Sequence, residues 1–407
     1  MKCGIFLALI GSRACLAVVR DIYAASYAGL VFRLRLDDNK DGSYSLEEVG
    51  SSLDCGYNPA WLALEKGTST LLCANEAYTI ANVGSLASFS KESLSILDNV
   101  TTDYGPAQAA FFATNRLGLA HYAGGAVSVY DTSDPSNLVE LQSFHYFMDK
   151  PGPNATLQDK PYPHGIVADP TGKFVVVLDR GADALRTYSV GWDDRLVELG
   201  PHFTEPGNGP RHGVFVKGTS KTFFYMLGEL TNSLHGFEAL YREDGSLGFR
   251  QFYNNSAYQT GFGDAAGGAH LLLSTRNDDR SAYAGAPSDT LASYRVDLDT
   301  GALALIGLSA SGGRWPRSFA VSADGKLVAV ADQYSVPGRL VVLARDPETG
   351  VIGDQTPLAT WTTNVTLPDG QSISHILWDD DDDEPSLAGL REDSLLLRGT
   401  PALGRFS

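Results

Sequence analysis

Hydrophobic residues recur along the chain in short runs separated by turn-forming residues, and the runs fall into groups of four. The clearest group is PHGIVADPTGKFVVVLDRGADALRTYSVGWDDRLVELG, which begins at Pro163. One β-branched run ends at Asp179, and Asp-Pro-Thr-Gly, Gly-Ala-Asp and Asp-Asp-Arg segments separate the apolar runs. Short runs of this kind, bounded by such turns, predict strands. The group therefore predicts four consecutive strands.

This four-strand group is repeated. PRSFAVSADGKLVAVADQ, from Pro316, matches its first half almost position for position, and weaker copies begin at Pro59, Pro106 and Pro210. A Gly-rich copy lies around GDAAGGAHLLLSTRNDD. The copies are about 47 to 57 residues apart, which is the length of one propeller blade. These copies predict six blades.

Partial strands at the two ends complete the ring. DIYAASYAGLVFRLRLD near the start and QSISHILWD near the end can together form a seventh blade, which removes the open sheet edges. The predicted fold is all-β: a seven-bladed β-propeller with four-stranded blades, the last blade being closed by N- and C-terminal strands. A β-solenoid or β-sandwich is the alternative, but its strands should not recur in groups of four.

The ends of the chain lie outside this repeat. MKCGIFLALIGSRACLAVVRD begins with Lys2, continues with an apolar stretch and ends in small residues, so residues 1–19 are predicted to be a secretory signal. Arg13 interrupts the apolar stretch, and a ragged N-terminal strand is the alternative. The propeller is predicted over residues 20–379. Residues 380–407, which begin with an acidic run, are predicted to be a disordered tail.

Composition restricts the partners of the protein. The 407 residues are 43% hydrophobic, which is ample for a large core. A net charge of −17 and a pI near 4.8 argue against a nucleic-acid partner, whose phosphates need a basic face. No apolar run reaches the length of about 18 residues that a membrane span needs. We expect a monomer that needs no cofactor.

Four sequons agree with secretion, because Asn-X-Ser/Thr is the acceptor of N-linked glycans in secreted proteins. They predict glycosylation at Asn99, Asn154, Asn254 and Asn364.

Cysteine usage also fits an oxidising compartment. Cys3 and Cys15 would leave with the signal, so the mature chain would keep Cys55 and Cys73. A disulfide between these two is predicted, and two buried free thiols are the alternative.

The stretch DDNKDGSYSLEEV, residues 37–49, has the spacing of an EF-hand calcium loop, with oxygen donors at Asp37, Asn39, Asp41 and Glu48. An EF-hand needs a helix on each side, but the preceding VFRLRL alternates with a period of two. The residues that follow are rich in helix breakers. A β-hairpin is therefore the prediction, and a helix-free cation site is the alternative.

Four polar residues are predicted to meet at one mouth of the central channel. His164 and Arg211 start the innermost strands of successive blades, whereas Glu229 and Arg276 end second strands. Because neighbouring strands run antiparallel, a second strand returns to the face where the first begins. Paired Arg forks suit substrate carboxylates, and a His and a Glu can exchange protons. Each residue alone could instead be structural, and Glu229 could simply pair with Arg211.

The segments PHGIVADPTGKFVVVLDRGAD, GPRHGVF, LGELTNSL, STRND and PRSFAVSADGKLVAVADQ, in this order, resemble the seven-bladed-propeller lactonase family. That family includes the 6-phosphogluconolactonases and the carboxy-cis,cis-muconate cyclases. IYAASYAG and DCGYNPAWLAL are most similar to its secreted fungal branch. The resemblance extends from about Asp21 to Trp378.

The resemblance implies a set of active-site residues. In the muconate cyclases a His, two Arg and a Glu at these motifs are the proposed active site, and they carry over to His164, Arg211, Glu229 and Arg276. The family usually has Asn where this chain has Thr275, directly before Arg276. Another Asn common in the family is replaced by Asp332.

The activity implied is that of an extracellular enzyme acting on a small-molecule lactone or a carboxylated muconate. It would hydrolyse a lactone, of the aldonolactone or 6-phosphogluconolactone type, or form one as the cyclases do. In hydrolysis Glu229 or His164 would activate water and an Arg would stabilise the oxyanion. The absence of a Gly-rich cradle or a Lys cluster disfavours a phosphorylated substrate. A non-catalytic secreted propeller, acting as a binding module or surface antigen, is the alternative function, and a calcium-dependent binding protein is a third.

Overall fold

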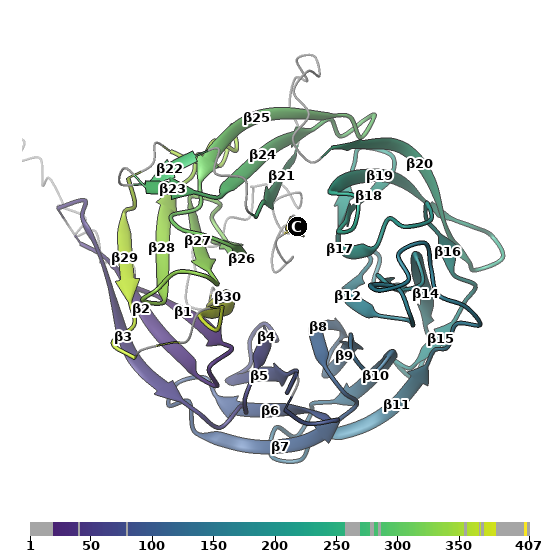
Figure 1. The fold of residues 1–407 in the computed structure, drawn as a ribbon, viewed down its shortest axis with the longest axis horizontal. Coiled ribbons are helices and arrows are strands. Elements are labelled where there is room, and N and C mark those ends of the chain that lie inside the picture. The colour runs from purple at the N-terminus through teal and green to yellow at the C-terminus, as the bar shows by residue number, and fades with distance from the viewer. Residues whose placement is uncertain are drawn as a thin grey trace, which may run out of the picture.

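The strands of the computed structural model are arranged as blades around a central axis (Figure 1). In the part of the chain that the structure describes, they form seven sheets of four or five strands and one separate two-stranded hairpin. The predicted seven-bladed β-propeller is therefore confirmed. The structure describes residues 19–39, 41–78, 80–256, 269–276, 281–283, 286–353, 356–365, 367, 370–379 and 403–404.

The blades, numbered in chain order, have the following strands. Blade 1 has β1 (Val19–Ser26), β2 (Val31–Asp38), β3 (Tyr44–Ser52) and β30 (Ile373–Asp379). Blade 2 has β4 (Pro59–Leu64), β5 (Thr70–Asn75), β6 (Gly84–Ser90) and β7 (Ile96–Thr102). Blade 3 has β8 (Pro106–Ala113), β9 (Arg116–His121), β10 (Ala126–Asp131) and β11 (Val139–His145). Blade 4 has β12 (Pro163–Ala168), β13 (Phe174–Asp179), β14 (Ala184–Val190), β15 (Leu196–Glu198) and β16 (His202–Phe203). Blade 5 has β17 (Pro210–Lys217), β18 (Thr222–Gly228), β19 (Ser233–Tyr241) and β20 (Leu247–Ser256). Blade 7 has β26 (Pro316–Val321), β27 (Leu327–Asp332), β28 (Arg339–Ala344) and β29 (Ala359–Thr362).

Blade 6 contains β21 (Ala269–Ser274), β24 (Thr290–Val296) and β25 (Leu303–Ala310). The hairpin of β22 (Ser281–Tyr283) and β23 (Ala286–Ser288) interrupts it. The segment GFGDAAGG, in which the sequence predicts the inner strand, lies outside the described residues. At the inner edge of β21, β31 (Leu403–Gly404) pairs in parallel with it. The rest of the predicted tail, like residues 1–18 of the predicted signal, lies outside the described residues.

Blade 1 closes the ring as predicted. β30, from the end of the chain, pairs antiparallel with β1, with Tyr23 opposite Leu377. The Trp378 indole donates a hydrogen bond to the Ala320 carbonyl of the neighbouring blade, at 2.9 Å. Because strands from the two ends of the propeller pair within one blade, the ring closes without an unpaired strand edge where the ends meet.

The DDNKDGSYSLEEV stretch is the hairpin between β2 and β3. Asp38 lies opposite Tyr44, and the Asp41 carboxylate accepts hydrogen bonds from the backbone and hydroxyl of Ser43. Glu48 is part of the ladder, opposite Leu34, and not part of the turn. The predicted hairpin is confirmed, and Asp41 uses its side chain as aspartates do in turns.

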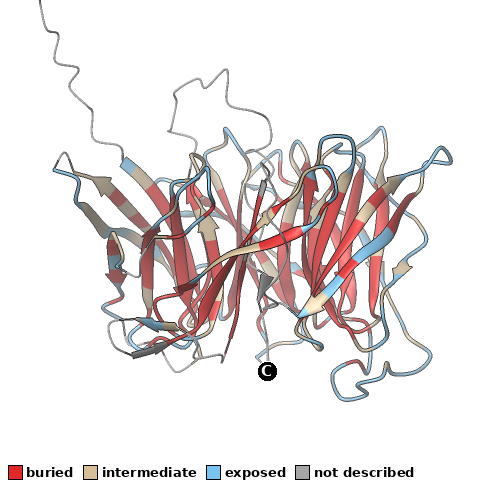
Figure 2. Cartoon of the chain, turned by 90° about the horizontal axis from the view of Figure 1, so that it is seen from above, coloured by how far each residue is buried: buried red, intermediate tan, exposed pale blue. Residues whose placement is uncertain are grey.

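The core lies between blades. All six residues of β13 are buried, because blades cover both faces of its sheet, whereas the outer β11 is largely exposed. Figure 2 shows the same gradient, with buried residues along the inner strands and exposed ones at the rim and loops. One cluster joins Phe32 of blade 1 to Trp361 of blade 7, with ring centroids 4.9 Å apart. Neighbouring blades thus bury each other and hold the ring together.

Two predictions that bear on secretion fall on described residues. Cys55 and Cys73 form a disulfide, with Cα atoms 6.1 Å apart. The four sequon asparagines are all exposed: Asn99, Asn154, Asn254 and Asn364. Glycosylation at these residues stays a prediction. The part of the chain that the structure describes contains no helix able to cross a membrane.

Candidate active site

A β-bulge is repeated at the start of the innermost strands. In blades 2, 3, 4, 5 and 7 this strand begins with Pro, and the register shifts between the proline and the residue two positions later. The residue between them is therefore unpaired, and bulges of this kind redirect a side chain. The bulge residues in blade order are Ala60, Ala107, His164, Arg211 and Arg317.

A second set of residues follows directly after the second strands. Because each second strand is antiparallel to the inner one, its last residue lies opposite the first proline, as Asp179 lies opposite Pro163. The residue after the second strand donates its backbone N–H to the carbonyl oxygen of the residue before that proline. In blade 5, for example, the Glu229 N–H donates to the Gly209 oxygen at 2.8 Å. In blade 6 the Thr275 N–H extends the ladder to Thr290, which gives Arg276 the same position. The full set is Tyr27, Glu76, Tyr122, Arg180, Glu229, Arg276 and Gln333.

Glu229 is held between two guanidinium groups. Its Oε2 atom lies 2.7 Å from Nε of Arg180 and 3.4 Å from Nε of Arg211. Both arginines are buried, and neither of these contacts uses Oε1 of Glu229. The expected proximity of Arg211 and Glu229 is therefore present, with Arg180 as a further partner. Two guanidinium groups thus meet at one carboxylate oxygen of Glu229.

His164 is a buried, neutral imidazole beside this pair. Its ring meets those of Tyr122 and His212 edge-on, with centroids 5.4 and 4.9 Å away. Burial, followed by the charge of Arg211, lowers the pKa of His164 well below 6.5. Its Nδ1 atom is buried and has no hydrogen-bond partner among the described residues. An unpartnered buried nitrogen is costly in a folded protein unless a ligand uses it.

Arg276 belongs to the same charge cluster. Its guanidinium lies over the Trp315 ring, 5.0 Å from the centroid, and its side chain is buried. Burial and the positive charges of Arg211 and Arg317 lower the pKa of Arg276 well below 12.5. Burial likewise lowers the pKa of Arg211 to about 10. The structure thus places all four predicted residues at one mouth of the channel.

Sequence reasoning missed a group on the other side of the mouth. Arg317 lies over the Tyr27 ring, 4.4 Å from its centroid, and donates a hydrogen bond to the Tyr27 hydroxyl. Tyr27 in turn donates to Oε2 of Glu76 over 2.6 Å. The signal for Arg317 was present, because PRS in blade 7 repeats the PHG and PRH motifs of blades 4 and 5. Arg180 was similarly signalled by LDRG, which matches LGEL in repeat phase.

A layer of rings and amides lies immediately below the mouth. Trp61 packs against His375 with ring centroids 3.8 Å apart, and Gln108 hydrogen-bonds to Nδ1 of His212 at 3.1 Å. The second contact joins blade 3 to blade 5 and is possible because blade 4 has Gly165 between them. A Cβ atom there would lie 2.4 Å from the Arg211 carbonyl oxygen and 3.2 Å from the Gln108 side chain. This layer forms the floor of the site.

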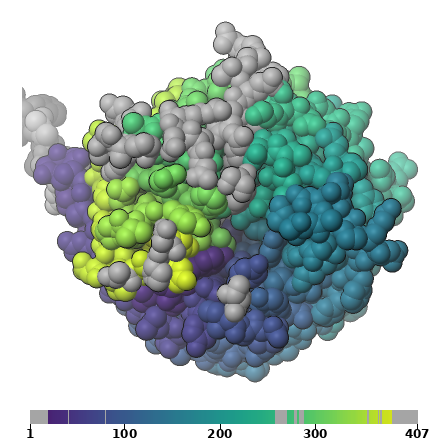
Figure 3. All heavy atoms as spheres, in the orientation of Figure 1, coloured from purple at the N-terminus to yellow at the C-terminus, as the bar shows by residue number. Residues whose placement is uncertain are grey.

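The mouth is positively charged although the protein is acidic. Four arginines (180, 211, 276 and 317) face two glutamates (76 and 229), so the formal sum is +2 in a chain whose net charge is −17. Seen along the axis, the surface is hollowed near the centre of the ring (Figure 3). A recessed cluster of buried guanidinium groups favours an anionic ligand.

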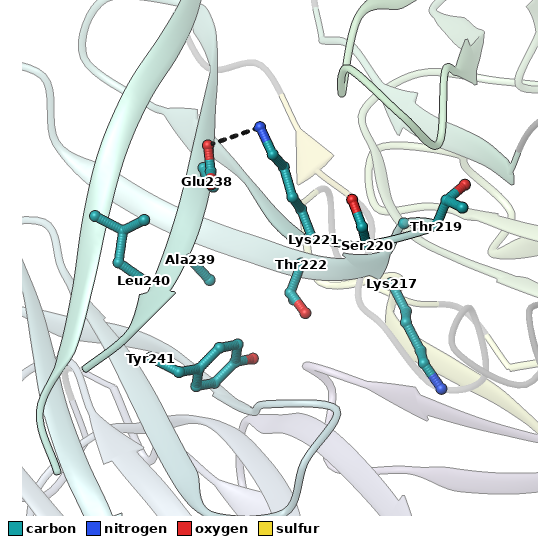
Figure 4. A pocket seen from close by; sticks show the side chains of 10 residues that line it. Lys217, Thr219, Ser220, Lys221, Thr222, Glu238, Ala239, Leu240 and Tyr241 are labelled. Carbon is teal, nitrogen blue, oxygen red and sulfur yellow. Dashed lines mark hydrogen bonds and ion pairs between the residues drawn. The ribbon is translucent and has the colours of Figure 1, made fainter. Parts of the chain in front are cut away.

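A separate pocket of about 510 Å³ lies at the other end of blade 5 (Figure 4). It is lined by Lys217, at the far end of β17, and by Lys221, Glu238 and Tyr241. Lys221 already pairs with Glu238 over 3.4 Å. The pocket shares no residue with the mouth, and we assign it no part in the site.

A family described as "Lactonase, 7-bladed beta-propeller" matches residues 21–362. The chain belongs to this lactonase family. This membership confirms the expected enzyme class, that of a lactonase. The lactonase chain is 29% identical over 340 residues to an Arthroderma benhamiae protein named "Probable 6-phosphogluconolactonase" (81% of this chain, 83% of that protein).

Two further proteins are similar to this lactonase-family chain. It is 30% identical over 328 residues to the 6-phosphogluconolactonase of Bacillus subtilis (79% of this chain, 88% of that protein). Among solved structures, the periplasmic gluconolactonase of Pseudomonas aeruginosa superposes with a TM-score of 0.68 at 23% identity. That match covers 89% of this chain and 99% of the other, and it supports the fold alone.

Proposed function

We propose that the protein is an extracellular lactonase that hydrolyses an aldonolactone and prefers a substrate bearing an anionic group. The observation that carries this proposal is the Glu229 side chain, held by Arg180 and Arg211, together with His164, whose buried Nδ1 atom has no hydrogen-bond partner among the described residues. The excess of arginine over glutamate at the mouth favours an anionic lactone, which outweighs the lack of a phosphate cradle in the sequence. The lactonases named among its relatives agree with this choice.

In this mechanism Glu229 acts as the general base. Its Oε1 atom takes a proton from a water molecule as the water oxygen attacks the lactone carbonyl carbon. Negative charge develops on the carbonyl oxygen, where Arg211 and Arg276 stabilise it. His164 is neutral and positions the substrate by a hydrogen bond. The acyl–oxygen bond then breaks, which opens the ring to a hydroxy acid.

The activity test uses the purified mature protein with δ-gluconolactone, 6-phosphogluconolactone and a carboxymuconolactone, each corrected for spontaneous hydrolysis. We expect turnover of a sugar lactone, a loss of at least 100-fold in kcat for Glu229→Gln, and a smaller loss for His164→Ala. Glu238→Gln is the matched control, because Glu238 also pairs with two cations, Arg250 and Lys221, but far from the mouth. Turnover of no lactone would favour a binding module instead. Full activity in both mouth variants would refute the assignment of the site.

Extracellular location is supported by the predicted signal over residues 1–19, by the disulfide and by the exposed sequons. N-terminal sequencing and deglycosylation of protein recovered from the medium of a eukaryotic host test it. We expect a processed N-terminus and a mass loss with an N-glycosidase. Retention of an unprocessed, glycan-free chain inside the cells would contradict the location.

A further inference from the structure

We propose that Glu76 is a second acid–base residue of the site, which donates a proton to the ring oxygen of the lactone as the acyl–oxygen bond breaks. This inference rests on the proposed lactonase function and adds a residue that the resemblance does not supply.

The position of Glu76 in the repeat is that of Glu229. Each residue follows a second strand, and each backbone N–H donates to the carbonyl before the inner-strand proline, at 3.0 Å to Asn58 and 2.8 Å to Gly209. Among the described residues that directly follow the second strands, Glu76 and Glu229 are the two with a carboxyl side chain. Blades 2 and 5 lie on opposite sides of the axis, as the places of β5 and β18 in Figure 1 show. The two residues therefore come from opposite sides of the ring, and Arg211, which pairs with Glu229, also lies near enough to act on the Glu76 carboxyl group.

The surroundings of the two carboxyl groups differ in a way that separates their roles. Glu229 touches two guanidinium groups through Oε2. Glu76 is 8% exposed and accepts the Tyr27 hydroxyl at 2.6 Å. Its nearest guanidinium contact, from Nη2 of Arg317 to Oε1, is 3.7 Å, which is beyond hydrogen-bond length. Burial raises the pKa of Glu76, against the opposing effects of Arg317 and of the Tyr27 hydrogen bond.

Two carboxyl groups with such different surroundings are the usual arrangement of an acid and a base in one site. The chemistry of lactone opening needs both. Water loses one proton to Glu229, its oxygen bonds to the carbonyl carbon, and the electrons of the breaking bond go to the ring oxygen. That oxygen is an alkoxide in a sugar lactone and must gain a proton, which Glu76 supplies from Oε1. Return of the first proton from Glu229 to Glu76 through solvent restores the enzyme.

A purely structural role is the competing explanation, in which Glu76 only orients Arg317. The two explanations differ in how much the leaving group matters. An aryl lactone such as dihydrocoumarin releases a phenol, which leaves without a proton far more readily than an aliphatic alcohol. Loss of an acid therefore harms the sugar lactone selectively, whereas a misplaced arginine harms both substrates.

The test compares Glu76→Gln with wild type on δ-gluconolactone and dihydrocoumarin, across pH 5 to 9. We expect kcat on the sugar lactone to fall about 100-fold or more, and kcat on the aryl lactone to fall less than about fivefold. The wild-type rate should decline as pH rises past the pKa of Glu76, because the acid must be protonated, and this decline should be absent in the variant. Glu140→Gln is the matched control, since Tyr130 donates to Glu140 over 2.9 Å on outer strands.

Three results would overturn the role of Glu76. The first is a Glu76→Gln variant within threefold of wild type on the sugar lactone. The second is an equal loss on both lactones together with a raised KM, which indicates a structural role. The third is a variant whose rate declines with rising pH just as the wild-type rate does. This result also decides the matter if the wild type does not accept the aryl lactone. A wild type that hydrolyses no lactone refutes the proposed function itself, which is a distinct outcome.

Discussion

Asp332 should make the stability of the propeller depend on pH, and Asp332→Asn should remove that dependence. The carboxyl group ends β27 and is 1% exposed, and its Oδ1 atom accepts the Ser311 hydroxyl at 2.8 Å. Burial raises the pKa of Asp332 from 3.8 to about 7, although the Ser311 hydrogen bond and Arg339 oppose the rise and Asp289 adds to it. The folded protein therefore holds a proton on Asp332 at pH values where the unfolded chain has released it.

The sign and size of the effect follow from this difference in proton binding. Below about pH 4 both states carry the proton; as pH rises toward 7 only the folded state does, so the free energy of unfolding falls. The interval of about three pH units, at ~1.4 kcal/mol each, sets a ceiling of about 4 kcal/mol. Asparagine can keep the Ser311 hydrogen bond and does not titrate. Between pH 4.5 and 8 the variant should therefore lose about 2 to 4 kcal/mol less than wild type.

Urea unfolding at pH 4.5, 6, 7 and 8 measures this difference directly. Asp244→Asn is the control, because the Asp244 carboxylate also accepts a serine hydroxyl, from Ser246, but is exposed. Parallel stability curves for wild type and Asp332→Asn would refute the argument. They would mean that the buried carboxyl group stays ionised, with Arg339 as a full counterion.

Three further predictions concern the disulfide, the floor and the charge of the mouth. Replacing Cys55 and Cys73 by Ser should lower the free energy of unfolding by about 3 kcal/mol in urea, because the 18-residue separation then no longer restricts the unfolded chain; an unchanged midpoint would contradict this. Gly165→Ala should cost about 1 to 3 kcal/mol in thermal unfolding and reduce activity, since its Cβ would lie 2.4 Å from the Arg211 carbonyl oxygen, whereas Gly307→Ala meets no atom within 4 Å and should be neutral. Arg317→Met should raise KM about 10-fold more for 6-phosphogluconolactone than for neutral gluconolactone; equal changes would show that Arg317 does not bind the anionic group.

The fold was predictable because similar segments recur along the sequence at the spacing of one blade. The turn after Ala168 and the β-branched run ending at Asp179 recur in blade 7 almost unchanged, and one recognisable blade predicts the rest. The hairpin at residues 37–49 was predictable for a related reason: the alternating VFRLRL before it can form a strand but not an amphipathic helix. Blade 6 shows the limit, since a Gly-rich segment gives no periodic pattern from which a strand can be predicted.

The candidate site was predictable only in part, because repeat phase gives a position but not a partner. It placed Glu229 and Arg211 at the same mouth, and the ion pair of 3.4 Å follows from that placement. It could not show that Arg180, one blade earlier, approaches Glu229 more closely, at 2.7 Å. Such contacts depend on side-chain length and on how far each blade is rotated about the axis. Glu76 was missed although it follows its second strand as Glu229 does, because a single acidic residue after a strand is ordinary in sequence. The structure adds its burial and its contact with Tyr27.

The distribution of bulge residues around the ring suggests how a lactone fits. On blades 1, 2 and 3 these residues are small, with Ser374 between the paired residues of β30, then Ala60 and Ala107. On blades 4, 5 and 7 they are His164, Arg211 and Arg317. One half of the inner ring therefore has short side chains at the bulge, and the other half has side chains that supply hydrogen bonds and positive charge. Under the proposed function, a lactone ring placed over the small side chains would direct its carbonyl and anionic groups toward the arginines, with Glu229 on one side and Glu76 on the other. The six blades whose inner strands are described thus share one backbone plan, and we place the chemistry in the blades that carry a functional side chain at the bulge or after the second strand.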